Sequence, residues 1–306
     1  MIPFRDLCAE WLKDWSGAMD VYMTPSCTSA LEAAALILNV KPGDEVIMPS
    51  WTHPSTANAF ALRGAVPVFV DVDPATLNLN PDLLKAALTS KTRGIVPIHY
   101  AGVIADMESI VGFAEWHGLW VMEDAAQALL SSGGGGQLAP ACSFGDLAAI
   151  SFHDTKNVGC GEGGALFVNN SKYRERAAMV VECGTDRRLP GRVGNYRWQT
   201  LGGSHIMGEP CAALLWNRLQ TAKWSTGRRL EAWHAAKAEL ESYGFEDEHA
   251  TEPGNGHIFW VMDELAPGAS HFEPLHLSPA GVRYGRVASP MPVTERAGRE
   301  LRRLPL

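Results

Sequence analysis

The sequence predicts an α/β protein in two parts: a large three-layer α/β/α domain around a mostly parallel sheet, residues 1–210, and a reduced α+β domain, residues 211–306. Residues 21–170 alternate short apolar runs with helical patterns, which is typical of a parallel sheet covered by helices on both faces. After about residue 205 two long helical patterns precede a short remainder rich in proline and glycine. A length of 306 residues is ample for one large domain and a smaller one.

The individual elements follow from the spacing of the apolar residues. Short apolar runs bounded by polar or turn residues predict strands at 21–23, 46–48, 66–70, 94–98, 120–122, 147–151, 164–168 and 258–262. Helical spacing predicts helices at 28–38, 54–63, 81–88, 107–117, 173–183, 212–222 and 228–242. Ser26 or Thr28 can cap the first helix and Asn80 the third, because short polar side chains accept hydrogen bonds from free N–H groups at helix starts.

Charge and composition exclude several classes of function. A formal net charge of −8 argues against general nucleic-acid binding, which needs a basic surface. Six scattered cysteines without a CxxC pair favour a reducing, cytoplasmic compartment and no structural zinc. The N-terminus lacks an apolar signal core, and no run approaches the ~18 apolar residues of a membrane span, so no membrane segment is expected. Arg187, Arg188, Arg192 and Arg197 form a local basic cluster that either receives an anionic substrate or is a solvated loop.

Lys156 is the most informative residue. It lies in a tight loop between the predicted strands at 147–151 and 164–168, where it can be half buried. Burial disfavours the charged ammonium and lowers the pKa of a lysine. A neutral amine can form a Schiff base with an aldehyde.

A carboxylate at the end of a neighbouring strand complements this lysine. Glu123 and Asp124 close the predicted strand at 120–122, and ligands sit at strand ends in α/β sheets. The two side chains point to opposite faces, so at most one easily reaches a ligand. A Schiff-base lysine and a strand-end aspartate are the two groups that a pyridoxal phosphate site needs, although a lone aspartate there is equally often a helix cap.

Five further candidates depend on this context. Thr28 and Ser29 open a helix directly after a strand, where free N–H groups and the helix dipole favour a phosphate, although simple capping is the better explanation of this stretch taken alone. Gln127 can hydrogen-bond a cofactor oxygen or be an ordinary first-turn polar residue. His53 can stack on a planar cofactor, and Trp51 competes for that role.

Ser151 can add a phosphate donor or bond to backbone at its strand end. Motifs for other chemistries are absent from the sequence: no GxGxxG follows the first strand, there is no GxSxG elbow, and no His/Glu metal spacing occurs.

Together these stretches resemble the DegT/DnrJ/EryC1/StrS sugar aminotransferase family, whose members are pyridoxal phosphate-dependent enzymes of fold type I. The stretches that carry the resemblance, in family order, are 26–30, 42–50, 68–73, 97–102, 123–127 and 151–165. Residues 24–28, 151–157 and 202–207 are most similar to the dTDP-4-amino-4,6-dideoxygalactose transaminases of surface-polysaccharide biosynthesis.

The resemblance implies a role for each candidate. Lys156 would hold the cofactor aldehyde and shuttle a proton, and Asp124 would hold the pyridinium. Gln127 would lie by the ring oxygen and His53 would take the stacking place, which is usually aromatic. Thr28, Ser29 and Ser151 would hold the phosphate.

The implied reaction is ping-pong. L-glutamate would donate the amino group, and C4 of a nucleotide-linked 4-keto-6-deoxy sugar would receive it. The resemblance also implies a homodimer whose active sites draw residues from both chains.

The ends of the chain depart from the family pattern. Residues 8–12 match a helix that members reach after a longer N-terminal segment, and the region between 260 and 271 lacks an expected helix and strand. Glu209 and Pro210 are expected to interrupt a helix start. These departures support an alternative: a trimmed, catalytically impaired homologue that binds the cofactor and has a regulatory or structural role. A sugar 3-dehydratase is a third reading, but such enzymes carry histidine in place of the lysine, so Lys156 counts against it.

Overall fold

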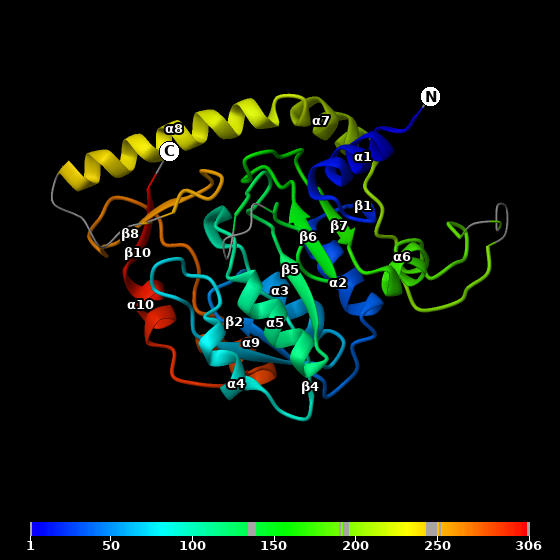
Figure 1. Ribbon diagram of the computed structural model, residues 1–306, viewed down its shortest axis with the longest axis horizontal. Helices are drawn as coiled ribbons and strands as arrows, with labels where there is room; N and C mark the ends of the chain where they lie inside the picture. Colours follow the sequence, from blue (N-terminus) through cyan, green and yellow to red (C-terminus); the bar gives the residue numbers. More distant parts are fainter. Residues whose placement is uncertain are drawn as a thin grey trace.

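The computed structural model describes residues 2–133, 139–189, 191, 196–242, 250 and 252–304. Within these residues eight strands form one sheet in the order β1-β7-β6-β5-β4-β2-β3-β9 (Figure 1). The strands are β1 (Asp20–Thr24), β2 (Glu45–Pro49), β3 (Val66–Val70), β4 (Thr92–Ile95), β5 (Trp120–Asp124), β6 (Leu147–Ser151), β7 (Gly164–Val168) and β9 (Arg286–Val287). Only β7 runs antiparallel to its neighbours β1 and β6, so the sheet is mostly parallel.

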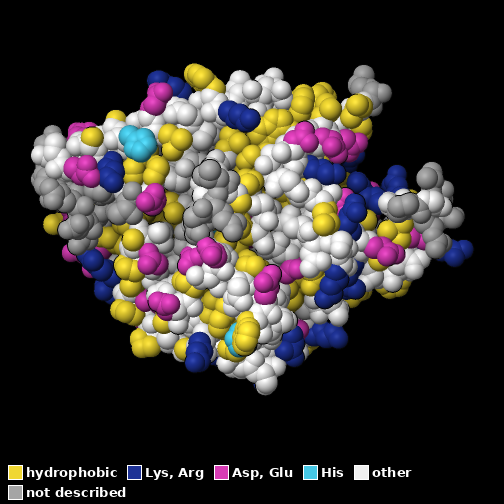
Figure 2. All heavy atoms as spheres, viewed as in Figure 1, with side chains coloured by type: hydrophobic (Ala, Val, Ile, Leu, Met, Phe, Trp, Pro, Cys, Tyr) yellow, Lys and Arg dark blue, Asp and Glu magenta, His cyan; other side chains and the backbone are white. Residues whose placement is uncertain are grey.

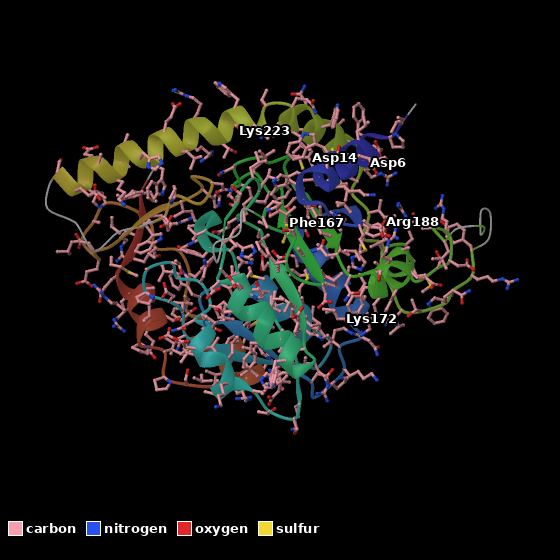
Figure 3. The ribbon with its side chains drawn as sticks, viewed as in Figure 1. Asp6, Asp14, Phe167, Lys172, Arg188 and Lys223 are labelled. Atoms are coloured by element: carbon pink, nitrogen blue, oxygen red, sulfur yellow. The ribbon has the colours of Figure 1, made fainter. Side chains whose placement is uncertain are left out.

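Helices cover both faces of this sheet and make three layers, as the sequence predicts. One face carries α1 (Phe4–Ser16), α4 (Leu84–Ala87), α5 (Met107–His117) and α7 (Glu209–Leu219). The other face carries α2 (Cys27–Ile37), α3 (Pro54–Ala61) and α6 (Arg174–Val180). Each face has its own apolar core, and Phe167 of β7 lies in the core beneath α1, where its ring meets Trp15 edge-on (Figure 3).

The last third of the chain builds a third core beside the sheet. The long helix α8 (Ala222–Ser242) crosses above the sheet from α7 toward the two-stranded sheet of β8 (Phe259–Met262) and β10 (Leu301–Leu304) (Figure 1). Helices α9 (Pro279–Tyr284) and α10 (Pro292–Glu300) complete this part. Its core joins Trp233, Phe259 and Leu301 to Trp51 and Tyr100 of the large sheet's loops.

The observed elements depart from the prediction in several places. The helices expected at 212–222 and 228–242 are α7 and the longer α8, and α9, α10, β9 and β10 are not among the predicted elements. The helix expected at 81–88 is a 3-10 turn, η1 (Pro81–Leu83), followed by the single turn α4. Similarly, the helix expected at 173–183 is η3 (Ser171–Tyr173) followed by α6. The strand expected at 94–98 ends at Ile95. Glu209 and Pro210 do not interrupt a helix but begin α7, because proline at the first turn removes an N–H that has no partner there anyway.

The division into two domains near residue 210 stays a prediction. The chain beyond that point is not wholly separate from the large sheet, because β9 pairs with β3 at its edge. Two further 3-10 turns lie in loops: η2 (Tyr100–Gly102), whose Tyr100 belongs to the third core, and η4 (Leu275–Leu277), whose Leu275 belongs to the core beneath α2 and α3.

The surface carries acidic and basic side chains interspersed over the face seen in Figure 2, without a continuous basic area on that face. Of the helices in the described residues, none has the length and apolar character needed to cross a bilayer.

Candidate active site

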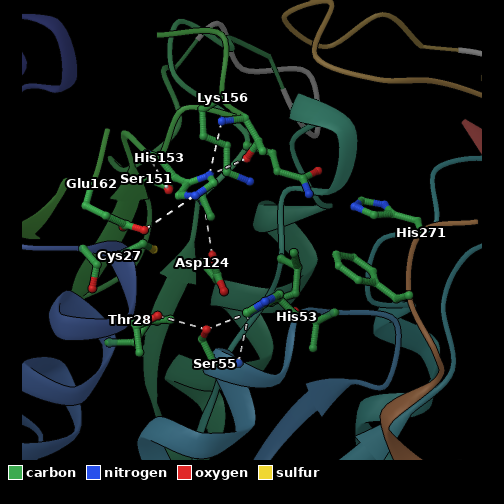
Figure 4. Close-up of a pocket in the computed structure, with 18 residues that line it drawn as sticks. Cys27, Thr28, His53, Ser55, Asp124, Ser151, His153, Lys156, Glu162 and His271 are labelled. Atoms are coloured by element: carbon green, nitrogen blue, oxygen red, sulfur yellow. Dashed lines mark hydrogen bonds and ion pairs between the residues drawn. The ribbon is translucent and has the colours of Figure 1, made fainter. Parts of the chain in front are cut away.

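The carboxyl ends of the central strands open into one cavity of about 480 Å³. His53 follows β2, Asp124 ends β5, Ser151 ends β6, and Lys156 lies in the connection from β6 to β7. Figure 4 shows these four side chains around the same space. The sheet therefore brings together residues that are up to 103 positions apart in sequence, because parallel strands end at the same edge.

The loop that carries Lys156 is held by its own hydrogen bonds. The Asp154 N–H donates to the Gly161 carbonyl at 3.1 Å, the Gly161 N–H donates to Asp154 Oδ1 at 2.7 Å, and the Lys156 N–H donates to the His153 carbonyl at 2.9 Å. Burial lowers the pKa of Lys156, and the nearby Arg303 lowers it further, whereas Asp124 opposes this shift. The amine is thus biased toward the neutral form that attacks a carbonyl carbon.

Asp124 presents its carboxylate to the cavity while two donors hold it. The Thr56 hydroxyl donates to Oδ2 at 2.7 Å and the Ala126 N–H donates to Oδ1 at 3.1 Å. Thr52 lies one helical turn before Thr56 and hydrogen-bonds to it at 2.9 Å. The side chain is 4% exposed, so its orientation is set by these contacts rather than by solvent.

Glu123 lies on the opposite face of β5 and does not line the cavity. Its carboxylate accepts hydrogen bonds from the backbone N–H groups of Cys142, Phe144 and Gly145 at 2.7–3.0 Å and lies 2.9 Å from His99 Nε2. A buried charge needs such a full set of partners. Of the two adjacent acids, Asp124 alone is therefore available to a ligand, as the strand alternation predicts.

The start of α2 forms an anion seat. Ser26 caps the helix through the Ser29 N–H at 3.1 Å, whereas the N–H groups of Cys27 and Thr28 find no acceptor within the described chain. Gly164 of β7 lies directly against this turn: a Cβ there would come within 2.4–2.5 Å of the Ser26 carbonyl carbon and the Cys27 nitrogen. The free N–H groups and the positive helix end favour a phosphate.

Two side chains, those of Thr28 and Ser55, connect this seat to His53. The Thr28 hydroxyl donates to Ser55 Oγ at 3.0 Å, and the Ser55 hydroxyl donates to His53 Nδ1 at 2.6 Å. Burial lowers the pKa of His53, which favours its neutral form.

Of the remaining predicted residues, two line the cavity and one does not. Ser151 and Gln127 line the cavity, and Gln127 Oε1 also accepts from the Ala101 N–H at 2.6 Å. Ser29 does not line it, because its hydroxyl is hydrogen-bonded to His205 Nδ1 at 2.8 Å. The phosphate role of Ser29 stays a prediction.

The cavity also contains residues that sequence reasoning missed. Among them are Cys27, Thr52, Ser55, His153, Glu162, His271 and Phe272. The first four lie within two positions of predicted residues, and Glu162 lies in the stretch 151–165 that carries the family resemblance, so all five could have been found by extending each motif. His271 and Phe272 come from the last part of the chain, and no local pattern connects them to Lys156.

The basic cluster lies away from this cavity. Arg188 pairs with Glu182 at 3.0 Å, Arg187 lies 3.8 Å from the same carboxylate, and Figure 3 shows Arg188 near α6. Arg192 is outside the described residues, and Arg197 does not line the cavity. Within the described chain, Arg187 and Arg188 are thus paired with Glu182 on a surface loop, which supports the reading of a solvated loop over that of a substrate site.

These groups fit pyridoxal phosphate on the chemistry of their donors. The unpaired N–H groups at the start of α2 and the Ser151 hydroxyl suit its phosphate, Asp124 suits its ring nitrogen, and Lys156 suits its aldehyde. A three-layer α/β/α fold, with this aspartate at the end of one strand and this lysine in the loop after another, defines the class of pyridoxal phosphate-dependent transferases of fold type I. The sequence profile of the DegT/DnrJ/EryC1/StrS aminotransferase family matches residues 5–270, and the chain belongs to that family.

Individual relatives agree with this assignment. The chain is 41% identical over 199 residues to a UDP-2-acetamido-2-deoxy-3-oxo-D-glucuronate aminotransferase of Pseudomonas aeruginosa, covering 64% of this chain and 55% of that one. It is 33% identical over 300 residues to a pleiotropic regulatory protein of Geobacillus stearothermophilus, covering 91% and 77%. The solved structure of NtdA from Bacillus subtilis with bound cofactor PMP superposes with a TM-score of 0.82 at 26% identity, covering all of this chain and 73% of that one. The chain thus spans little more than half the length of the Pseudomonas relative.

Proposed function

We propose that this chain is a pyridoxal phosphate-dependent aminotransferase that moves an amino group from L-glutamate to a nucleotide-linked keto sugar. One observation carries the proposal: the buried amine of Lys156, with its lowered pKa, opens into the same cavity as Asp124 and the start of α2. The sugar-nucleotide class comes from the family and from relatives such as the Pseudomonas enzyme.

Bound pyridoxal phosphate supplies an electrophilic carbonyl carbon and a ring that accepts the electrons of a broken C–H bond. Lys156 Nζ, whose lowered pKa favours the neutral amine, would take the proton from the α-carbon of the amino donor and return it at the cofactor side. Asp124 would keep a proton on the ring nitrogen, and the hydrogen bond from the Thr56 hydroxyl holds the Asp124 carboxylate in place. The start of α2 binds the phosphate and fixes the position of the ring.

The geometry argues against the impaired homologue, because both reacting groups are present and oriented. L-glutamate as the donor, the 4-keto-6-deoxy sugar as the acceptor, a homodimer and a cytoplasmic location are parts of the proposal that rest on the family resemblance.

The test is an absorbance spectrum of the purified protein loaded with pyridoxal phosphate, recorded before and after addition of L-glutamate. We expect the visible band of the lysine-bound cofactor to disappear as the pyridoxamine form accumulates. In Lys156→Ala we expect no visible band, no borohydride-reducible link to the protein and no turnover, with the fold retained by circular dichroism.

Lys172→Ala is the matched control, because Lys172 is exposed and lies in η3, away from the cavity. It should behave as the unmodified protein. Undiminished turnover in Lys156→Ala would contradict the proposal, and a visible band that L-glutamate leaves unchanged would exclude glutamate as the donor.

A further inference from the structure

A second cavity adjoins the active-site cavity at His271 and Phe272. It has a volume of about 570 Å³ and shares Thr52, His53, His271 and Phe272 with the active-site cavity. His271 and Phe272 are stacked, with ring centroids 3.7 Å apart, and so form one partition at the junction. Figure 4 shows His271 facing the active-site space from the side opposite Thr28 and Cys27.

His271 is held from behind by Tyr100. Tyr100 is fully buried in η2, and its hydroxyl oxygen lies 2.8 Å from His271 Nδ1. Burial raises the pKa of Tyr100, so the phenol keeps its proton. A buried hydroxyl proton needs an acceptor, and His271 Nδ1 is the partner that the described chain gives it, so we assign Tyr100 as the donor. Nδ1 is therefore the acceptor, and a neutral His271 carries its own proton on Nε2.

The groups around His271 keep the imidazole neutral. Burial lowers the pKa of His271 to about 3, and the cations Arg303 and Lys156 and the ring of His53 act in the same direction. Within the described chain, none of the carboxylates that line the two cavities, Asp124, Glu162 and Glu273, is bonded to the imidazole. Burial and the neighbouring cations favour the uncharged imidazole near neutral pH.

Nε2 makes no hydrogen bond within the described chain, although Nδ1 does. A fixed neutral donor at the opening between two cavities is suited to a neutral oxygen, because its N–H carries no charge that would favour an anion. Such a donor also rejects a ligand that lacks the matching oxygen, since the N–H would then be left without a partner.

The second cavity supports a role in ligand binding rather than in cofactor binding. Its walls are mainly apolar and include Phe69, Leu275 and Tyr284. No Lys or Arg lines it within the described residues, and Glu273 is its charged group, so it suits an uncharged part of a ligand.

We propose that His271 is a specificity-determining residue: its Nε2–H donates a hydrogen bond to a neutral hydroxyl or carbonyl oxygen of the amino acceptor where the two cavities meet, and Tyr100 is the positioning residue that holds this tautomer. The inference rests on the proposed function, since it assigns a contact to the acceptor of that reaction.

The first experiment does not depend on turnover. The cofactor-loaded protein with ¹⁵N-labelled histidine is followed by NMR from pH 5 to 9, with the His271 signals assigned from His271→Gln. We expect one tautomer, protonated at Nε2, with no titration in this range, and in Tyr100→Phe a mixture of the two tautomers. Titration of His271 between pH 5 and 9, or a proton on Nδ1, would overturn the proposal even if the transaminase assignment holds.

The second experiment separates the two half-reactions, with dTDP-4-keto-6-deoxyglucose as the acceptor probe. For His271→Phe, which keeps the stacking on Phe272, we expect the KM for the probe to rise roughly 3- to 10-fold, the cost of one lost neutral hydrogen bond. The KM for L-glutamate should change less. His271→Gln, which retains an N–H donor, should recover part of the loss.

Two controls keep the result interpretable. His234→Phe changes an exposed histidine of α8 and should alter neither constant. Because His271→Phe leaves the buried Tyr100 hydroxyl without its acceptor, the double variant Tyr100→Phe/His271→Phe removes that penalty and should show the same rise in KM.

Equal losses in both half-reactions would mean that His271 only supports the cofactor site, and an unchanged KM for the probe would exclude the contact. If the unmodified protein fails to react with L-glutamate, the proposed function is wrong, while the NMR result still decides the protonation and position of His271.

Discussion

At the residue scale, Glu123 and Asp124, which are adjacent in β5, have different roles. Glu123 is fully buried and satisfies three backbone N–H groups and His99, whereas Asp124 is turned by Thr56 toward the cavity. The alternation of side chains along a strand is the whole cause, because neighbouring positions must face different layers. This pair separates a structural carboxylate from a functional one within a single dipeptide.

The corresponding substitutions should have different consequences. Asp124→Asn should slow the half-reaction with L-glutamate by about 100-fold or more, because a ring nitrogen without a carboxylate partner loses its proton and accepts electrons poorly. Glu123→Gln should instead lower the free energy of unfolding by roughly 2–4 kcal/mol, because buried N–H groups lose a charged acceptor. Stopped-flow absorbance measures the first effect and urea unfolding the second.

Together the two variants test whether Asp124 acts in the reaction and Glu123 in stabilising the fold. Half-reaction kinetics of Asp124→Asn equal to those of the unmodified protein would remove Asp124 from the site. A Glu123→Gln variant with normal stability and a slow half-reaction would mean that the two assignments are reversed.

At the element scale, the site depends on how closely β7 approaches the start of α2. Gly164 pairs with Thr24 of β1 across the sheet and touches the turn at Ser26 and Cys27. The lack of a side chain at this position lets the anion seat lie against the strand that leads away from the Lys156 loop. A helix start and a strand are thereby held at the separation that one ligand can bridge.

Gly164→Ala should weaken cofactor binding at least about tenfold and destabilise the fold by roughly 1–3 kcal/mol, because the new Cβ would overlap backbone atoms that cannot rotate away. Titration of the visible absorbance with pyridoxal phosphate gives the affinity. Gly112→Ala is the control: it lies inside α5 with open space around it, so alanine should stabilise by up to about 1 kcal/mol. Full cofactor affinity in Gly164→Ala would show that the close approach is not required.

A second connection joins the lysine loop to the last third of the chain. Asn157, next to Lys156, donates to the Asn255 carbonyl at 2.9 Å and lies 2.8 Å from His257 Nδ1. Asn255 in turn donates to the carbonyl of Gln127 at 2.9 Å. The turn at 253–257 therefore supports both the lysine loop and the start of the segment after β5.

At the scale of the whole molecule, the end of the chain folds back onto the edge of the large sheet. β9 pairs with β3, and Arg286 donates two hydrogen bonds to Glu45 at 2.7 and 2.9 Å. Asp71 accepts from the Val293 and Thr294 N–H groups at 3.0 and 2.8 Å. These contacts place residues 271–285 beside the active site, so the aromatic partition depends on them.

Glu45→Gln should lower the free energy of unfolding by roughly 1–3 kcal/mol at pH 7, because Arg286 loses its charged acceptor. The Arg286 hydrogen bonds lower the pKa of Glu45, so the ionised side chain stabilises the folded state above the ordinary pKa of glutamate. This contribution is lost as the pH falls through the lowered pKa. Urea unfolding at pH 7 and at acid pH should show a difference that shrinks on acidification.

Glu231→Gln is the control for this pair, because Glu231 and Arg228 form an exposed ion pair on α8 whose loss costs little. A Glu45→Gln effect that is the same at both pH values would mean that the charge of Glu45 is not what stabilises the edge.

Much of this arrangement can be predicted from the sequence, because the buried strands of a parallel sheet are short apolar runs and its helices are amphipathic. The strands at 66–70, 147–151 and 164–168 and the helix at 107–117 are found at the predicted bounds, since each is a compact apolar or amphipathic run. Lys156 and Asp124 meet because the topology of such a sheet places their strand ends side by side. The helix expected at 81–88 shortens to little more than a turn, which depends on packing that no local pattern records.

The sequence by itself determined the three-layer fold, since periodicity within a few tens of residues fixes its strands and helices, and it predicted Lys156 and Asp124 as the site pair from their places in a loop and at a strand end. The tertiary structure alone decided that Ser29 turns to His205, that Thr56 orients Asp124, and that Tyr100 holds His271 at the junction of two cavities. These contacts join residues 68 to 176 positions apart, and side-chain direction at that range is set by packing rather than by the local sequence.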